Sequence, residues 1–237
     1  MIKFDYSKIV VVILAGGKAT RLKHLTVNKP KSLIKIKNEY FIIIQLKILQ
    51  KNGFKKVVVC CGHLAQQIKQ KIKLYKFNMQ IIFSNDGKNL VGTGGAIKKA
   101  LKHLSEDFIV IYGDVFFQLN FKKILNSFNK NKKKFESFMI IQKNNRKYEN
   151  SNIQMLKNNE ILYDKFITNE NMEYIDYGVS IFKKKTFTKF KKKIFNLSEV
   201  QSNLSYKKKL YGWLSKKNSY EIGSFEGIRN LKELEIK

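Results

Sequence analysis

The first 130 residues alternate short apolar runs with longer segments in which apolar residues recur at helical spacing. The predicted strands cover residues 8–15, 55–62, 79–84 and 107–114, and the predicted helices cover residues 41–53, 65–75 and 93–104. This alternation is typical of a parallel sheet with helices on both faces. We therefore expect a Rossmann-like, doubly wound α/β unit over residues 1–130, with ligands bound where its strands end.

The pattern changes after the lysine-rich run at residues 129–134. Shorter strands are predicted over residues 137–142, 151–156, 160–164 and 174–182, followed by a helix over residues 226–236. These strands predict a mainly parallel, mixed sheet with a small antiparallel extension, and Ser224 is the expected N-cap of the last helix. No repeat or long linker interrupts the chain, so we expect a single domain over residues 1–237, with halves at 1–130 and 131–237.

The charge of the chain favours an anionic partner, but its composition argues against specific reading of nucleic acid. Lys and Arg number 47 against 18 Asp and Glu, which gives a net charge of +29 and a pI near 10.0. Arginine occurs only at Arg21, Arg146 and Arg229, although arginine makes the bidentate contacts typical of sequence readers. We attribute the charge mainly to compositional drift. A non-specific nucleic-acid binder stays an alternative, and it predicts steep salt dependence.

Other sequence features favour an intracellular protein without a metal centre of cysteine or histidine. No apolar run approaches the roughly 20 residues of a membrane span, and no secretory signal pattern occurs, so we expect the cytoplasm. Cys60 and Cys61 are neighbours in an apolar run, which predicts buried, reduced thiols. His24, His63 and His103 lack ligand spacing and receive no catalytic role.

The segment LAGGKATRLKHLTVNKPKSLI, residues 14–34, follows the first predicted strand. Gly16 and Gly17 therefore lie where a backbone can approach a phosphate, yet the segment has neither a P-loop nor a G-x-G-x-x-G pattern. It resembles the signature of sugar-1-phosphate nucleotidyltransferases, roughly L-A-G-G-x-G-T-R-L, then L-T, then P-K-x-L. The matching residues are Gly16, Gly17, Thr20, Arg21, Leu22, Leu25, Thr26, Pro30, Lys31 and Leu33. Ala19 replaces a glycine of the family, which predicts a slightly reshaped loop.

Five later segments resemble the same family in the same order. They are VGTGGAIKKA (91–100), YGD (112–114), LYDK (162–165), YIDYGVSIF (174–182) and YEIGSFEGI (220–228). The whole set is similar to the bacterial branch that includes heptose-1-phosphate guanylyltransferases. The resemblance implies the nucleotide-diphospho-sugar transferase fold, with a nucleotide-binding half at residues 1–130 and a sugar-phosphate-binding half at residues 131–237.

The resemblance also implies a role for each matching residue. The catalytic group comprises Arg21, Lys31 and Asp114; the nucleotide-binding group comprises Leu14, Ala15, Gly16, Gly17, Gly92, Thr93 and Gly94; the sugar-phosphate group comprises Lys165, Asp176, Tyr177 and Gly178. Mg²⁺ is implied as cofactor, held by Asp114 and Glu221, with Asp176 as the alternative second ligand. For Asp114 itself, the alternative is a helix N-cap.

The implied reaction joins a nucleoside triphosphate to a sugar 1-phosphate, and it yields a nucleoside-diphosphate sugar and pyrophosphate for surface polysaccharide synthesis. GTP with a heptose 1-phosphate is preferred as the substrate pair. UTP or CTP with another sugar phosphate, or with a substrate such as phosphocholine, is the alternative. A catalytically idle regulator that binds a nucleotide sugar is an alternative from another class. The sequence does not indicate an oligomeric state.

Overall fold

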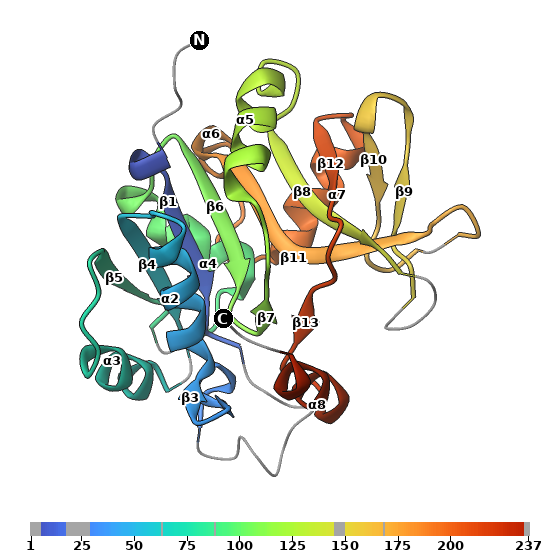
Figure 1. The fold of residues 1–237 in the computed structure, drawn as a ribbon. Helices are drawn as coiled ribbons and strands as arrows, with labels where there is room; N and C mark the ends of the chain where they lie inside the picture. The colour runs from blue at the N-terminus through green and yellow to red at the C-terminus, as the bar shows by residue number, and fades with distance from the viewer. Residues whose placement is uncertain are drawn as a thin grey trace.

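A computed structural model of the chain describes residues 6–17, 29–62, 64–87, 89–144, 150–167 and 169–234. A central mixed sheet organises the molecule (Figure 1), and its main path has the order β10-β9-β11-β6-β1-β4-β5. Its parallel strands are β1 (Val10–Leu14), β4 (Lys56–Cys61), β5 (Gln80–Asn85) and β6 (Asp107–Tyr112). Val12 lies opposite both Val58 and Val110, so one buried row of valines joins β4, β1 and β6, and β5 pairs with the outer side of β4.

Helices cover both faces of this sheet, which confirms the doubly wound arrangement. One face packs against α2 (Phe41–Lys51), α3 (Ala65–Lys73) and α5 (Phe121–Asn131), and Figure 1 shows α2 and α5 in front of the strands. The other face packs against α4 (Gly92–Ala100), α6 (Lys184–Thr188) and α7 (Leu197–Tyr206). Within the described ranges, every helix is too short or too polar to cross a bilayer.

The second half extends the sheet on the β6 side, as the sequence predicts. β11 (Tyr174–Lys183) is antiparallel to β6 and to β8 (Ser137–Lys143), while β9 (Ile153–Met155) and β10 (Ile161–Tyr163) form an antiparallel pair at the edge. The sheet also contains a strand that the sequence did not predict, β12 (Leu210–Leu214), which pairs in parallel with β8.

Helices α5 and α7 and strand β12 are the main elements that the sequence analysis did not predict. In α5, the buried residues Phe121, Ile124, Leu125 and Phe128 follow helical spacing within a lysine-rich segment. The predicted last helix is present as α8 (Phe225–Glu233), and Ser224 caps it as expected, since its hydroxyl accepts the Gly227 N–H at 3.1 Å.

Short elements close the carboxyl end of the parallel strands. β7 (Val115–Phe116) pairs with β13 (Tyr220–Glu221), and β2 (Lys35–Ile36) pairs with β3 (Glu39–Tyr40). A separate apolar cluster holds them to α8, and its members include Ile36, Phe41, Phe116, Ile222 and Leu231. The C-terminal segment is thereby fixed beside the end of β6.

Candidate active site

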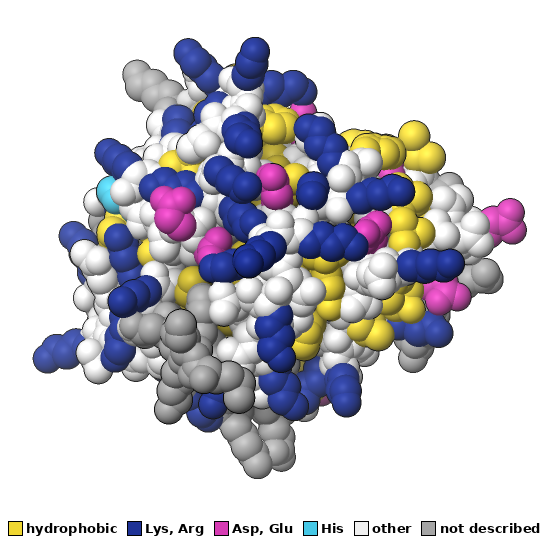
Figure 2. Space-filling model, turned by 90° about the horizontal axis from the view of Figure 1, so that it is seen from above, with side chains coloured by type: hydrophobic (Ala, Val, Ile, Leu, Met, Phe, Trp, Pro, Cys, Tyr) yellow, Lys and Arg dark blue, Asp and Glu magenta, His cyan; other side chains and the backbone are white. Residues whose placement is uncertain are grey.

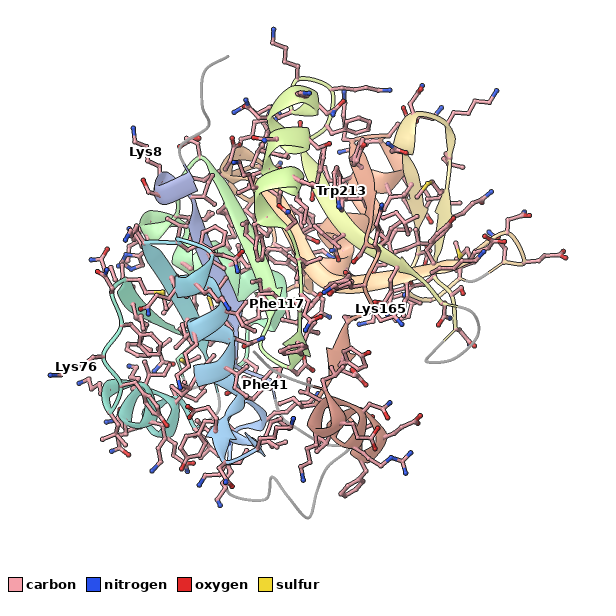
Figure 3. The ribbon with its side chains drawn as sticks, viewed as in Figure 1. Lys8, Phe41, Lys76, Phe117, Lys165 and Trp213 are labelled. Atoms are coloured by element: carbon pink, nitrogen blue, oxygen red, sulfur yellow. The ribbon has the colours of Figure 1, made fainter. Side chains whose placement is uncertain are left out.

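A cavity of about 280 Å³ lies at the carboxyl ends of β1, β4, β5 and β6 and the start of α4. Eight of the residues implied by the resemblance line it: Leu14, Ala15, Gly16, Gly17, Lys31, Gly92, Thr93 and Asp114. A larger groove of about 770 Å³ lies near Phe117 and Trp213, both labelled in Figure 3, and contains none of the implied residues. The smaller cavity is therefore the candidate active site.

The backbone closes tightly around the end of β1. The Ala15 N–H donates to the Cys60 carbonyl at 2.9 Å, and the Gly113 N–H donates to the Leu14 carbonyl at 3.0 Å. A Cβ at Gly16 would lie 2.8 Å from the Gly62 nitrogen, which is closer than real Cβ contacts come. Glycine at this position lets two strand ends approach each other and leaves main-chain groups at the cavity wall.

Lys31 and Asp114 form the charged pair of the cavity. The Lys31 Nζ lies 2.6 Å from the Asp114 Oδ2, and the two side chains are 22% and 30% exposed. Pro30 is buried and precedes a short helical turn, Lys31–Leu33, which fixes the direction of the lysine. Asp114 lies in the turn between β6 and β7, so it does not cap a helix. Two of the three predicted catalytic residues thus meet in one place.

Glu221 reaches the same region through the β7–β13 ladder. Glu221 pairs with Val115, and the Ile222 N–H donates to the Asp114 carbonyl at 2.9 Å. A Cβ at Gly223 would lie 2.7 Å from the Lys31 Nζ and 3.2 Å from the Glu221 Oε1, so both side chains border Gly223. Within the described residues no cluster of three or more His, Cys, Asp and Glu can hold a metal ion.

Asp176 and Gly178 form a bulge in β11 near the end of β6. The pairing of β11 with β8 shifts between Asp176 and Ser180, Gly178 has φ +85°, and its N–H donates to the Asp176 Oδ1 at 2.8 Å. Burial raises the pKa of Tyr112, and the Asp176 carboxylate raises it further. Tyr112 lines the cavity, whereas Asp176 and Gly178 are not among its lining residues.

Tyr177 lies in the core beside the loop after β7. Its side chain is fully buried, and its hydroxyl accepts the Gln118 N–H at 3.2 Å and donates to the Asn218 carbonyl at 3.3 Å. Burial raises the pKa of Tyr177 to about 12. Tyr177 does not line the cavity, and its contacts hold the loop after β7 to the segment before β13.

Lys165 and Gly94 also lie apart from the cavity lining. Lys165 is exposed after β10, in a turn where the Asp164 Oδ1 accepts the N–H groups of Phe166 and Ile167, and Figure 3 draws it between β11 and β13. The Gly94 N–H donates to the Phe195 carbonyl at 3.0 Å. A Cβ at Gly94 would meet the Phe195 ring at 2.3 Å, so this glycine serves helix packing.

Ser32 and Asp86 are cavity residues that sequence reasoning missed. Asp86 is 6% exposed and Ser32 is 3% exposed, and neither the Asp86 Oδ1 nor the Ser32 Oγ has a hydrogen-bond partner in the described part of the chain. Burial raises the pKa of Asp86, while the nearby Lys99 ammonium lowers it. A usable signal existed, because Asp86 directly follows a strand whose carboxyl end faces the expected ligand site.

Some residues named from the sequence lie outside the described ranges, whereas the two cysteines lie within them. Arg21 and Ala19 lie outside the described residues, as do His24 and His63. Cys60 and Cys61 are free and buried, as predicted. Burial raises the pKa of both thiols, that of Cys61 to about 12, so neither is a thiolate at neutral pH.

Comparison with known families finds a family model that matches most of the chain. The model of the family described as "Nucleotidyl transferase" matches residues 10–220. A D-glycero-alpha-D-manno-heptose 1-phosphate guanylyltransferase from Campylobacter jejuni is 34% identical over 113 residues, which cover 48% of this chain and 51% of the relative. A mannose-1-phosphate guanylyltransferase catalytic subunit beta from Drosophila melanogaster is 33% identical over 119 residues, which cover 48% and 32%. The matches thus span about half or less of these relatives.

Comparison with solved structures supports the fold along nearly the whole chain. HddC from Yersinia pseudotuberculosis, complexed with GMP-PN, aligns with a TM-score of 0.78 and 24% identity over 95% of this chain and 98% of that one. A putative glucose-1-phosphate thymidylyltransferase from Bacillus anthracis aligns with a TM-score of 0.77 and 15% identity over 94% of each chain. The mainly parallel mixed sheet is therefore the nucleotide-diphospho-sugar transferase fold.

Proposed function

Because the chain belongs to the nucleotidyl transferase family, we propose that it joins a nucleoside triphosphate to a sugar 1-phosphate and releases pyrophosphate. The observation that carries this proposal is the cavity in which Gly16, Gly17, Lys31 and Asp114 meet at the carboxyl ends of parallel strands. Such a cavity combines main-chain groups and the Lys31 ammonium with the carboxylates of Asp86 and Asp114, and the ammonium and main-chain groups suit a ligand made of phosphates.

The proposed reaction requires positioning and charge neutralisation rather than proton transfer. An oxygen of the sugar phosphate attacks the α-phosphorus, a new P–O bond forms, and the bond to the β-phosphate breaks as pyrophosphate leaves with its electron pair. No general base is needed, because a phosphate oxygen is already ionised at neutral pH. Lys31, and Arg21 by resemblance, would stabilise the charge that moves toward the leaving group. The buried Ser32 hydroxyl is available to donate to a phosphate oxygen.

Asp114 and Glu221 are the residues that would hold Mg²⁺. Their carboxylate oxygens are the hard ligands that this ion prefers, and the Lys31 ammonium paired with Asp114 indicates that the position accommodates a cation. A bound Mg²⁺ supplies positive charge that neutralises phosphate oxygens. Asp176 is the less favoured second ligand, because its Oδ1 already accepts the Gly178 N–H.

The preferred substrates are GTP and a heptose 1-phosphate. The support is the Campylobacter jejuni relative, which is named for this pair. Mannose 1-phosphate is the second candidate sugar phosphate, because the Drosophila melanogaster relative is named for it. We place the reaction in nucleotide-sugar biosynthesis that supplies polysaccharide assembly.

The test is pyrophosphate release from each of the four triphosphates with a panel of sugar 1-phosphates and Mg²⁺. We expect GTP with a heptose or mannose phosphate to give the highest kcat/KM. A chain that binds a nucleotide sugar tightly but turns over no pair is the idle regulator. Turnover of UTP or CTP in preference to GTP would replace the proposed base, and sequence-independent binding to DNA with no turnover would replace the enzyme.

A further inference from the structure

Gln45 is a fully buried amide in the middle of an apolar stretch of α2. Its neighbours Ile44 and Leu46 are buried, and Gln45 itself is 0% exposed. Its Nε2 donates to the Tyr112 carbonyl at 3.0 Å and to the Val115 carbonyl at 2.8 Å. Because carbonyl oxygens only accept hydrogen bonds, the nitrogen of the amide rather than its oxygen must face them.

The two carbonyls that Gln45 binds lie on either side of Asp114. Tyr112 ends β6 and Val115 begins β7, so the connection between these strands is two residues long, and Asp114 is the second of them. One side chain thereby holds both ends of this turn. A turn held at both ends gives Asp114 a fixed main-chain geometry, from which its carboxylate reaches the Lys31 Nζ at 2.6 Å.

The β7–β13 ladder directs the Val115 carbonyl away from β13. Hydrogen-bonded and non-hydrogen-bonded pairs alternate along an antiparallel ladder. The Ile222 N–H donates to the Asp114 carbonyl at 2.9 Å. The adjacent pair, Val115 with Glu221, is therefore the non-hydrogen-bonded one. Its carbonyl needs a donor from another element, and α2 supplies it through Gln45.

Strand β11 likewise stops one residue short of the Tyr112 carbonyl. The pairing of β11 with β6 extends as far as Val179 and Ile111. The next N–H of β11, that of Gly178, donates to the Asp176 Oδ1 instead of continuing the ladder. The bulge in β11 thus leaves the end of β6 to be held from α2.

Helix α2 also holds the segment that carries the lysine of the charged pair. The N–H of Phe41, the first residue of α2, donates to the Ile34 carbonyl at 3.0 Å. Ile34 directly follows the short helical turn Lys31–Leu33. Gln45 lies one helical turn after Phe41. A single helix therefore fixes both segments that meet in the ion pair.

The buried amide costs stability, which indicates a role beyond packing. The Gln45 Oε1 has no hydrogen-bond partner within the described residues, and an unpaired buried acceptor is unfavourable. A methionine of the same length would fill the space without that acceptor, but it would provide no donor for the two carbonyls. The two hydrogen bonds to the turn are what the amide contributes.

We propose that Gln45 is a positioning residue, whose amide fixes the turn between β6 and β7 and thereby holds Asp114 where it acts on Mg²⁺ and the phosphates. This inference rests on the proposed function. It adds to that function a residue that acts through Asp114 without touching a substrate.

The experiment compares Q45M with a matched control, Q201M. Gln201 in α7 is also 0% exposed, its Nε2 donates to the Ser180 Oγ at 3.3 Å, and its Oε1 is also without a partner in the described part of the chain. Helix α7 packs on the opposite face of the sheet. Both variants replace a buried amide by an apolar side chain of the same length, and only Q45M alters the contacts of the turn.

The first measurement needs neither metal nor turnover. Hydrogen–deuterium exchange of the full chain, followed by NMR, reports on the N–H groups of Gly113 and Ile222, which hold the turn to β1 and β13. In Q45M these two groups should exchange about tenfold faster than in the wild type, because the turn opens locally more often. In Q201M their exchange should stay within about twofold of the wild type.

The second measurement is steady-state pyrophosphate release at saturating Mg²⁺. In Q45M, kcat should fall about 10- to 100-fold, because a small displacement of a positioned group has that effect. KM for the triphosphate should stay within about threefold, since the main-chain groups of the cavity are unchanged. In Q201M, both values should stay within about twofold of the wild type.

Stability is monitored in both variants. Each hydrogen bond lost should lower the unfolding temperature by about 2–4 °C, so both proteins are assayed well below their unfolding temperatures. If Q45M unfolds early, Q45L repeats the comparison with a smaller apolar side chain that favours helix.

Unchanged exchange of the turn in Q45M would overturn the inference. So would faster exchange without a loss of kcat, or an equal loss of kcat in Q45M and Q201M. A wild-type chain that turns over no substrate pair would contradict the proposed function, and exchange then decides the role of Gln45. Faster exchange of the turn in Q45M alone would support Gln45 as the residue that fixes it, and equal exchange in the two variants would contradict that role.

Discussion

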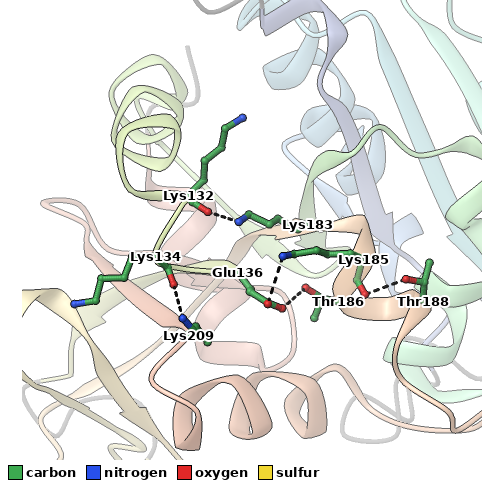
Figure 4. A network of polar contacts seen from close by, with 8 residues as sticks. All are labelled: Lys132, Lys134, Glu136, Lys183, Lys185, Thr186, Thr188 and Lys209. Carbon is green, nitrogen blue, oxygen red and sulfur yellow. Dashed lines mark hydrogen bonds and ion pairs between the residues drawn. The ribbon is translucent and has the colours of Figure 1, made fainter.

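The charged side chains at the two ends of the central sheet differ in the partners that they bind. At the amino end of the parallel strands, Lys183 donates to the Lys132 carbonyl, Lys209 donates to the Lys134 carbonyl at 3.2 Å, and the Glu136 carboxylate lies 3.6 Å from the Lys185 Nζ (Figure 4). Figure 2 views this end and shows basic side chains spread over it. These ammonium groups are bound by main-chain oxygens and by one carboxylate of their own neighbourhood.

At the carboxyl end, the charged groups of the candidate site lie in or next to the cavity. Lys31 forms an ion pair with Asp114, and Glu221 lies next to them because β13 pairs with β7. Asp86 is buried, and its Oδ1 has no hydrogen-bond partner within the described residues. The contrast teaches that the +29 charge is a poor guide to the active site. Unsatisfied polar groups in a cavity mark a ligand more reliably than an excess of lysine does.

The strongest way to test the contrast is a carboxylate-to-amide change at each end. D114N should lower kcat by about 10²- to 10³-fold, because a charge that positions phosphates and Mg²⁺ is lost. D107N, at the opposite end of the same strand, should keep kcat within about twofold. Steady-state pyrophosphate release measures both. Equal losses in the two variants would contradict the assignment of the carboxyl end as the active site.

The same comparison applies to lysine. Lys31→Met should lower kcat/KM about 100-fold, because an ammonium that stabilises phosphate charge is removed. Lys209→Met should leave kcat/KM within about twofold, since that ammonium donates to the Lys134 carbonyl at the opposite end of the sheet. A Lys31→Met enzyme with normal kcat/KM for every triphosphate would show that the ion pair with Asp114 is structural.

The choice of second metal ligand predicts a smaller effect. Glu221→Gln should require about tenfold more Mg²⁺ for half-maximal rate, because one hard oxygen ligand loses its charge. Asp176→Asn should leave the Mg²⁺ requirement nearly unchanged and alter KM for the sugar phosphate. Magnesium titration of both variants measures this. The reverse result would make Asp176 the ligand, and equal tolerance would contradict the pair of carboxylates.

The smallest expected effect concerns stability at the amino end. Glu136→Gln removes an ion pair with Lys185, whose side chains are 25% and 50% exposed. Solvent weakens such a pair, so unfolding should shift by at most about 1 kcal/mol, or about 2–4 °C for a chain of this size. Calorimetry measures the shift, and kcat should not change. A loss of activity in this variant would couple the two ends of the sheet.

The local pattern predicts most of the fold, but tertiary context decides several elements. β1 is wholly apolar, and β4 and β6 are apolar after their first residue, so their type is clear from sequence. In α5 the helical spacing of Phe121 and Ile124 is diluted by lysine and asparagine, and the helix is stable because that stripe packs on the sheet.

For the site, the motif residues Lys31 and Asp114 are predictable, because the family signature identifies them and strand ends bring them together. Asp86 and Ser32 are not predictable from periodicity. Their burial depends on neighbours far along the chain, and an unpaired oxygen is a property of the folded molecule. The cavity thus contains residues that the family signature identifies, and it also contains Asp86 and Ser32, whose burial and unpaired oxygens only the packing reveals.

The pairing of β7 with β13 also has a consequence for the order in which the protein matures on the ribosome. Asp114 emerges with the strands of the first half, whereas Glu221 is translated about a hundred residues later and reaches Asp114 only when β13 docks. A nascent chain can therefore form the strand ends that line the cavity before it has both carboxylates, and Asn196 completes the lining later. Under the proposed function, activity appears only after β13 has docked.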